Sequence, residues 1–272
     1  MKLSSLVFLV LLSPFANSVE TGEQMVEFME GLSAFHQQNY EKALKKWEPL
    51  AESGNDLAQF RLGELYLLGL GVQQNTKLGF EWMQRSADQG NSDAQHSLGR
   101  LYSSGQGVPK NEQIASKWML LAARQGNAQS QYFLGLNYFL GTGVEKDINK
   151  AIDWMTRAAE QDVAGAQSIL GQIYAVGQGV PQDFQLAAKW LSLGAENGDV
   201  EAQTGMGILY ANGTGVLQNN ISAHMWFNIA ASRGEQKAIQ NRKVLEQRMT
   251  QNDISKAQQI ARKCVEQNYK GC

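Results

Sequence analysis

The apolar residues of this chain recur with two spacings at once. Within short segments they fall three or four residues apart, as at Ala94, Leu98 and Leu101, which places them on one face of an α-helix. Over longer distances the pattern returns every 36 residues, which puts the tryptophans at Trp82, Trp118, Trp154, Trp190 and Trp226. A fixed period in this range is typical of a solenoid built from repeated supersecondary units. The pattern therefore predicts five stacked helical repeats.

Each period divides into a helix, a glycine-containing turn and a second helix. We place the five repeats at residues 55–90, 91–126, 127–162, 163–198 and 199–234. The first helices are predicted to begin at side chains that can cap a helix N-terminus, Asn55, Asn91, Asn127 and Asp199. They are predicted to end at glycines suited to a left-handed backbone, Gly69, Gly105, Gly141, Gly177 and Gly213. Asn or Asp also precedes every second helix, at Asn75, Asn111, Asp147, Asp183 and Asn219.

The second helices carry small residues around a large one, as in the segment from Ala151 to Ala159. Small residues let neighbouring helices approach closely, and we expect Trp154 to fill the space beside them. One junction departs from the pattern, because Asp162 replaces the usual glycine and Val163 replaces the usual cap. We expect this junction to be the weakest of the array.

Both ends of the array are predicted to be capped by atypical helices. Residues 19–54 resemble a repeat but lack the Gly-x-Gly-Val turn, and residues 235–272 lose the period. In the latter segment we expect polar amphipathic helices at 236–249 and 253–265. Terminal repeats of solenoids commonly differ in this way, because one of their faces meets water.

The pattern Ala-x-x-x-Leu-Gly-x-x-Tyr-x-x-Gly-x-Gly-Val…Ala-x-x-Trp resembles the Sel-one-like repeat family, a branch of the tetratricopeptide-like solenoids. The resemblance covers residues 55–234 strongly and 24–54 weakly. It implies an all-α fold, a right-handed α/α superhelix of 36-residue helix-turn-helix repeats. It also implies a secreted bacterial protein that acts as an interaction scaffold. A cysteine-rich subgroup has a disulfide in each repeat and a link to penicillin binding, but no repeat of this chain contains cysteine.

Charge does not favour a nucleic-acid or lipid partner. The 272 residues contain 24 Lys and Arg against 26 Asp and Glu, a formal net charge of −2 at pH 7, and no block of like charge occurs. We therefore expect a protein or peptide partner, with no nucleic acid, and a monomeric chain.

The first 18 residues are predicted to be a signal peptide. Lys2 precedes an apolar run from Leu6 to Leu12, and small residues around Ala16 provide a cleavage pattern. The run is too short to span a bilayer. We expect export to the periplasm, with the extracellular space as the alternative, and no membrane insertion of the mature chain.

The two cysteines, Cys264 and Cys272, are predicted to form a structural disulfide. An even pair near the end of an exported chain favours that interpretation over a zinc or redox site. Eight residues of continuous helix would separate them by about 12 Å, too far for a bridge. The last helix must therefore end near Asn268.

No sequence motif indicates catalysis or a cofactor. The three histidines, His36, His96 and His224, have no metal-binding spacing, and no nucleophile motif occurs. We predict a non-enzymatic scaffold without metal or cofactor. The alternative is a cell-wall-directed protein that binds or hydrolyses peptidoglycan or recognises β-lactams.

The columns that vary between repeats are the candidate binding site. On the first helices these positions fall off the core stripe, and we expect them to line a concave groove. The candidates are Phe60, Glu64, His96, Arg100, Tyr132, Leu136 and Phe139. The other interpretation is that several of them pack between neighbouring repeats.

Overall fold

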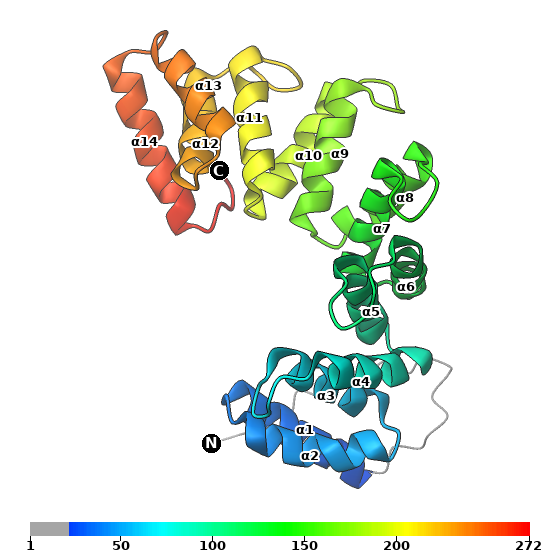
Figure 1. Cartoon of the computed structure of the whole chain (residues 1–272). Coiled ribbons are helices and arrows are strands. Elements are labelled where there is room, and N and C mark those ends of the chain that lie inside the picture. The colour runs from blue at the N-terminus through cyan, green and yellow to red at the C-terminus, as the bar shows by residue number, and fades with distance from the viewer. Residues whose placement is uncertain (1–21) are drawn as a thin grey trace. The chain divides into compact units, whose positions relative to one another are not determined.

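A computed structural model describes residues 22–272, and every regular element in this range is a helix (Figure 1). In chain order the helices are α1 (Gly22–His36), α2 (Tyr40–Glu52), α3 (Asp56–Leu68), α4 (Thr76–Asp88), α5 (Ser92–Ser104), α6 (Glu112–Arg124), α7 (Ala128–Leu140), α8 (Ile148–Ala159), α9 (Ala164–Val176), α10 (Phe184–Glu196), α11 (Val200–Asn212), α12 (Asn220–Ser232), α13 (Gln236–Glu246) and α14 (Gln251–Glu266). The predicted signal peptide, residues 1–18, lies outside the described residues.

The helices form two compact units. The N-terminal unit ends at Asn111 and contains α1–α5, and the C-terminal unit, Glu112–Cys272, contains α6–α14. Within each unit, consecutive helices pack in antiparallel pairs that stack along the chain, as α3 with α4 and α9 with α10. The all-α repeat fold predicted from the 36-residue period is confirmed.

Local chemistry sets the helix ends where the sequence predicts them. The side chain of Asn55 accepts a hydrogen bond from the Ala58 amide at 2.8 Å, and Asn127 and Asp199 cap their helices in the same way. The first helices stop at glycines in the left-handed region, with φ of +70° at Gly69. A side chain there would be strained, so this glycine ends the helix without that cost.

The core between paired helices differs from the prediction in one respect. In the pair α7–α8 the large residue that fills the space is the one after the tryptophan: Met155 is fully buried, whereas Trp154 is half-buried and stacks with Arg157, whose guanidinium carbon lies 5.1 Å from the ring centroid. The tryptophans of α10 and α12, Trp190 and Trp226, are buried as expected. The mid-helix glycine Gly135 makes room for Met155, because a Cβ there would lie 2.7 Å from Met155 Cγ. In the same way, Gly207 makes room for the ring of Phe227.

In the N-terminal cap a glycine again makes room for a large side chain, although the turn between the two helices is shorter. Trp47 is fully buried in α2, and its indole nitrogen donates to the Phe28 carbonyl at 3.2 Å. A Cβ on Gly31 would lie 2.2 Å from that nitrogen. Gly31 and Trp47 are 16 residues apart, whereas Gly135 and Met155 are 20 apart. The four residues missing from the α1–α2 turn therefore leave the glycine–large-residue contact intact.

A buried glutamine column connects successive repeats. Gln59 Nε2 donates to the Ala51 carbonyl at 3.0 Å, and Gln59 Oε1 accepts from Gln89 Nε2 at 2.8 Å, so one amide joins the turns before and after it. Four further glutamines donate to the preceding turn at 3.0–3.2 Å: Gln95, Gln131, Gln167 and Gln203. We call this series the glutamine ladder.

The ladder ends in an unsatisfied atom. Gln131 and Gln167 accept from the following turn at 2.8 and 2.9 Å, but the buried Gln203 Oε1 has no hydrogen-bond partner. The residue at the donor position is Arg233, whose guanidinium donates to the Gly198 carbonyl instead. An unpaired buried acceptor costs stability.

The irregular junction has the predicted local features. Asp162 adopts φ of +61° without being glycine, and Val163 makes no side-chain cap for α9. Val163 is instead 9% exposed and packs with Leu170 and Ile173. Whether this junction is the weakest of the array stays a prediction.

Candidate functional site

In the C-terminal unit, the first helix of each pair exposes one long face. The helices concerned are neighbours: α9 contacts α11, α11 contacts α13, and Tyr132 of α7 lies over Gly165 of α9. Large apolar side chains stand exposed on this face, Leu140 (65%), Val176 (72%), Ile208 (39%) and Val244 (53%). We call these four residues the apolar band. Each comes from a different helix, so the band crosses the layer of first helices.

Three of the four helices that carry the apolar band have few charges; the fourth, α13, contains Lys237, Arg242, Lys243 and Glu246. The helices α7, α9 and α11 contain a single charged residue among them, Glu201. Exposed amides lie on the same helices at Gln129, Gln172 and Asn212, and Gln172 Nε2 donates to Glu201 Oε2 at 3.3 Å. The surface of α7, α9 and α11 can desolvate a partner's apolar groups and hydrogen-bond to its backbone, and it offers one negative charge.

Tyr132, a predicted contact residue, is half-buried between α7 and α9. A Cβ on Gly165 would lie 2.9 Å from the Tyr132 hydroxyl, so any larger residue there would displace the ring from this position. Burial raises the pKa of Tyr132, and the charges of Asp199 and Glu201 raise this pKa further. The tyrosine therefore stays neutral at physiological pH and forms part of the wall of the face.

Leu136 and Phe139 are half-buried and pack against the core around Met155 and Ile173. Tyr132 belongs to the same cluster. These three residues support the exposed layer, and a truncation would disturb packing as well as any surface they offer.

The candidates in the N-terminal unit differ in exposure. Phe60 is 8% exposed and therefore lies in the interior, where it offers little surface to a partner. The Arg61 guanidinium carbon lies 5.1 Å from the Phe60 ring centroid, and Arg61 also donates to Glu64 at 2.7 Å. Glu64 is half-buried in this ion pair.

His96 and Arg100 lie one turn apart on α5, the first half-buried and the second exposed. Burial lowers the pKa of His96, the charge of Arg100 lowers it further, and Asp93 opposes the shift. A neutral imidazole beside an exposed guanidinium suits polar contacts.

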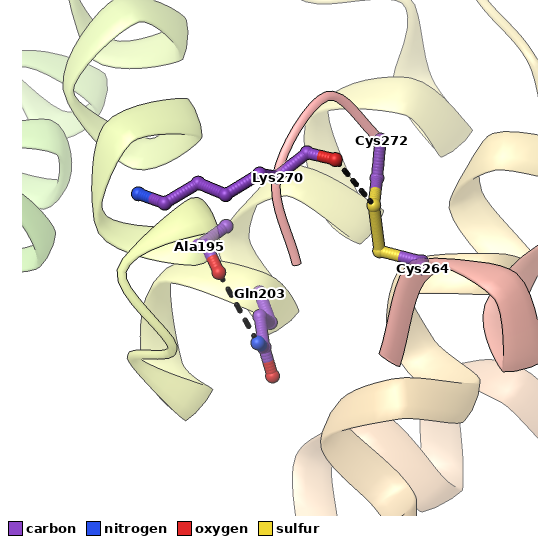
Figure 2. Close-up of a disulfide and its surroundings, with 5 residues drawn as sticks. All are labelled: Ala195, Gln203, Cys264, Lys270 and Cys272. Carbon is purple, nitrogen blue, oxygen red and sulfur yellow. Dashed lines mark hydrogen bonds between the residues drawn. A yellow bond between two sulfur atoms is a disulfide. The ribbon is translucent and has the colours of Figure 1, made fainter. Parts of the chain in front are cut away.

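The structure joins Cys264 and Cys272 in a disulfide, with their Cα atoms 5.7 Å apart (Figure 2). The helix α14 ends at Glu266, and the chain then turns back through Asn268 and Tyr269 with φ of +51° and +66°.

This returning tail reaches a distant turn. Lys270 Nζ donates to Asn197 Oδ1 at 2.6 Å, and the Tyr269 ring lies beside Gly198. The disulfide therefore closes a short tail that covers the turn between α10 and α11, next to the last step of the glutamine ladder at Gln203 and Ala195 (Figure 2).

His224 is fully buried. Its Nε2 lies 3.0 Å from Glu246 Oε1, which connects α12 to α13. Across residues 22–272 no group of three or more His, Cys, Asp or Glu side chains could hold a metal ion. In the same range, none of the helices has both the length and the apolar character needed to cross a bilayer.

Comparison with known proteins identifies the family. The Sel1 repeat model matches five consecutive segments, residues 56–91, 92–127, 128–163, 164–199 and 200–235. The chain belongs to the Sel1 repeat family. The matched segments each begin one residue after the repeats assigned from the period. Members of this family commonly mediate protein–protein interactions, so the fold is that of a repeat scaffold.

Two solved Sel1 repeat structures are similar to the chain. A Sel1 repeat protein from Oxalobacter formigenes is 32% identical, with a TM-score of 0.73, over 78% of this chain and 88% of that one. A protective antigen present in uropathogenic Escherichia coli strains is 27% identical, with a TM-score of 0.61, over 91% of this chain and 63% of that one. No curated protein matches the chain.

None of the seven predicted site residues belongs to the apolar band. Val176 stands one period after Leu140, and Val244 stands one period after Ile208. The signal was therefore present in the repeat columns. The column containing Phe60, in contrast, also contains the buried residues Ser168 and Thr204 and faces the neighbouring helices.

Proposed function

We propose that this Sel1 repeat protein is a non-catalytic scaffold that binds a protein or peptide partner on the exposed face of its first helices. The observation that carries the proposal is the apolar band. Leu140 and Val176 expose 65% and 72% of their surface on neighbouring helices with no charged residue. Contiguous exposed apolar surface on a folded protein marks an interaction site.

Several predicted contact residues have supporting roles in this proposal. Tyr132, Leu136 and Phe139 hold the face in position and contribute their exposed edges to a partner. Glu64, His96 and Arg100 lie on first helices of the N-terminal unit and give that unit a polar surface of its own. Phe60 is not included, because it is buried.

We further propose that the protein works in an oxidising compartment of the cell envelope. Disulfides persist in such compartments and are rare in the cytosol, and Cys264 and Cys272 form one. The predicted signal peptide agrees with export to the periplasm. Cell fractionation of the native chain, with thiol alkylation before and after reduction, tests this location. A chain recovered in the cytosol with free thiols would contradict it.

The binding proposal is tested by affinity capture from an envelope extract. The native chain is compared with the variant Leu140→Asp/Val176→Asp, and retained proteins are identified by mass spectrometry. The matched control is Leu121→Asp/Leu217→Asp, which changes two residues of the same unit that are 43% and 90% exposed outside the first helices. Circular dichroism establishes that all three proteins are folded.

We expect a partner that the native chain and the control retain and the apolar-band variant loses. Retention by all three proteins would place the binding site elsewhere. If no protein is retained by the native chain, the scaffold proposal fails.

A further inference from the structure

We propose that the apolar band binds an extended peptide segment with an apolar side chain at every third residue and a basic residue facing Glu201. This inference rests on the proposed function and specifies the chemistry of the partner. Three features of the surface support it: the spacing of the band, the amides beside it and the charge of Glu201.

The spacing of the band matches an extended chain. Neighbouring packed helices lie about 8–10 Å apart, so the three steps from Leu140 on α7 to Val244 on α13 cover roughly 24–30 Å. A polyproline II segment rises about 3.1 Å per residue with three residues per turn, so every third side chain returns to the same side after about 9.3 Å. Ten residues with apolar positions 1, 4, 7 and 10 therefore place one side chain on each helix, over about 28 Å.

The amides beside the band favour an extended segment over a helix. Gln129, Gln172 and Asn212 are exposed on α7, α9 and α11, the same helices that carry Leu140, Val176 and Ile208. A bound α-helix has already paired its backbone groups internally. An extended segment has not, so its N–H and C=O groups need partners when apolar contact removes water. Primary amides both donate and accept, and can meet either backbone group.

The charge on the three helices α7, α9 and α11 is negative, whereas α13, which carries Val244, contains Lys237, Arg242, Lys243 and Glu246. Glu201 is exposed and is the only charged residue on α7, α9 and α11. It lies seven residues before Ile208 on α11, about 10 Å along the helix. A lysine or arginine side chain on the bound segment can cover that distance and pair with Glu201. An acidic residue at that position would be repelled by Glu201, which gives this part of the surface a means of selecting its partner.

The test uses synthetic peptides and the full mature chain. The probe is a fluorescein-labelled 12-residue peptide of four Leu-Pro-Ser triplets in which one central Ser is replaced by Lys. The first control peptide has the same composition with its four leucines consecutive, and the second carries Glu in place of Lys. A third peptide of 18 residues places leucine at heptad positions of an amphipathic helix. Fluorescence anisotropy measures each Kd.

We expect the Lys probe to bind more tightly than all three control peptides. The variant Val176→Asn/Ile208→Asn should weaken binding of the probe by at least about tenfold, because each lost apolar contact is worth about 1 kcal/mol or more. The control Leu121→Asn, outside the layer, should leave binding unchanged. Glu201→Lys should reverse the preference between the Lys and Glu peptides, by about two- to fivefold as for an exposed ion pair.

Three results would overturn the inference. Equal binding of the probe and its rearranged control would show that the three-residue spacing is not recognised. Tighter binding of the helical peptide would assign the face to a helix, and an unchanged Lys-over-Glu preference in Glu201→Lys would remove the role of Glu201. If no peptide binds while Leu140→Asp/Val176→Asp still loses its partner from the extract, this inference fails and the scaffold proposal stands.

Discussion

Replacing Arg233 by glutamine should stabilise the C-terminal unit. Gln203 Oε1 is buried without a partner at the end of the glutamine ladder, and Arg233 occupies the position from which the earlier steps donate. The equivalent residue of the N-terminal unit, Gln89, shows what a glutamine can do there. It donates at once to the Gly54 carbonyl at 3.0 Å and to Gln59 Oε1 at 2.8 Å. Arg233→Gln should therefore keep the contact with Gly198 and add one with Gln203.

The magnitude follows from the acceptor that becomes paired. Leaving a buried polar atom unsatisfied costs about 1–3 kcal/mol, and a neutral hydrogen bond contributes about 0.5–1.5 kcal/mol net. The variant also exchanges a charged donor to Gly198 for a neutral one, which offsets part of the gain. We expect a net increase of about 1 kcal/mol in the free energy of unfolding. With a urea m-value of about 2 kcal/mol/M, the midpoint should rise by about 0.5 M.

Urea denaturation followed by far-ultraviolet circular dichroism measures this shift, and amide hydrogen exchange localises it to the turn between α10 and α11. The matched control is Gln89→Arg, which recreates the unsatisfied acceptor at Gln59 and should lower stability by a similar amount. A midpoint for Arg233→Gln that is equal to or below that of the native chain would refute the reasoning. The unpaired Gln203 oxygen would then not lower the stability by an amount that a glutamine at position 233 could restore.

Other predictions concern the tail, the irregular junction and pH. Replacing Cys264 and Cys272 by serine should cost about 2–3 kcal/mol from loop-closure entropy, seen in calorimetry as a lower Tm that reductant no longer changes; an unaltered Tm would contradict a stabilising role. Asp162→Gly should raise the free energy of unfolding by about 0.5–1 kcal/mol in urea denaturation, because it relieves the left-handed backbone; a loss would mean that the aspartate side chain contributes more than the strain costs. His96 has a folded pKa below its ordinary 6.5, so its contribution to stability is present above that pH and is lost as the pH falls through the lowered folded value. The variant His96→Gln should flatten that decline between pH 7.5 and 5, measured by denaturation at each pH, and an unchanged slope would assign the decline to other groups.

The sequence predicted the helices and their ends well, because these depend on local signals. Asn127 caps the helix that it precedes, and Gly141 ends the same helix with φ of +79°. Both effects act within one turn of the residue that causes them, so a single column of the repeat is enough to predict them.

The packing was harder to predict where two adjacent positions of the repeat both carry a large side chain that could fill the core. Trp154 and Met155 are both large and both recur with the period, yet adjacent residues of a helix point about 100° apart. Only the position of Gly135 on the paired helix decides that Met155 is the buried one. The larger side chain was therefore the wrong choice for the core of this repeat, although Trp190 and Trp226 of the same column are buried.

The site could be predicted only in part, since exposure depends on neighbours that a column does not specify. Position 60 and position 132 belong to one column, but Phe60 is buried and Tyr132 is half-buried over Gly165. The glutamine ladder was visible as a conspicuous column without a role. Its role is evident only in the structure, where residues 30 positions apart in the sequence, such as Gln161 and Gln131, form hydrogen bonds.

The glutamine ladder also has a consequence for how such a chain changes length. A complete step joins a glutamine to the residue 8 positions earlier and to one 30 positions later, as Gln59 joins Ala51 and Gln89; the last step, at Gln203, lacks the later partner. Duplicating or deleting one whole period with complete steps on both sides therefore brings equivalent partners together again, and the new junction inherits the same hydrogen bonds. An insertion of any other size inside a repeat would separate donor from acceptor. Genetic unequal crossing-over between the repeats would thus yield foldable proteins of longer or shorter reach in single steps of 36 residues.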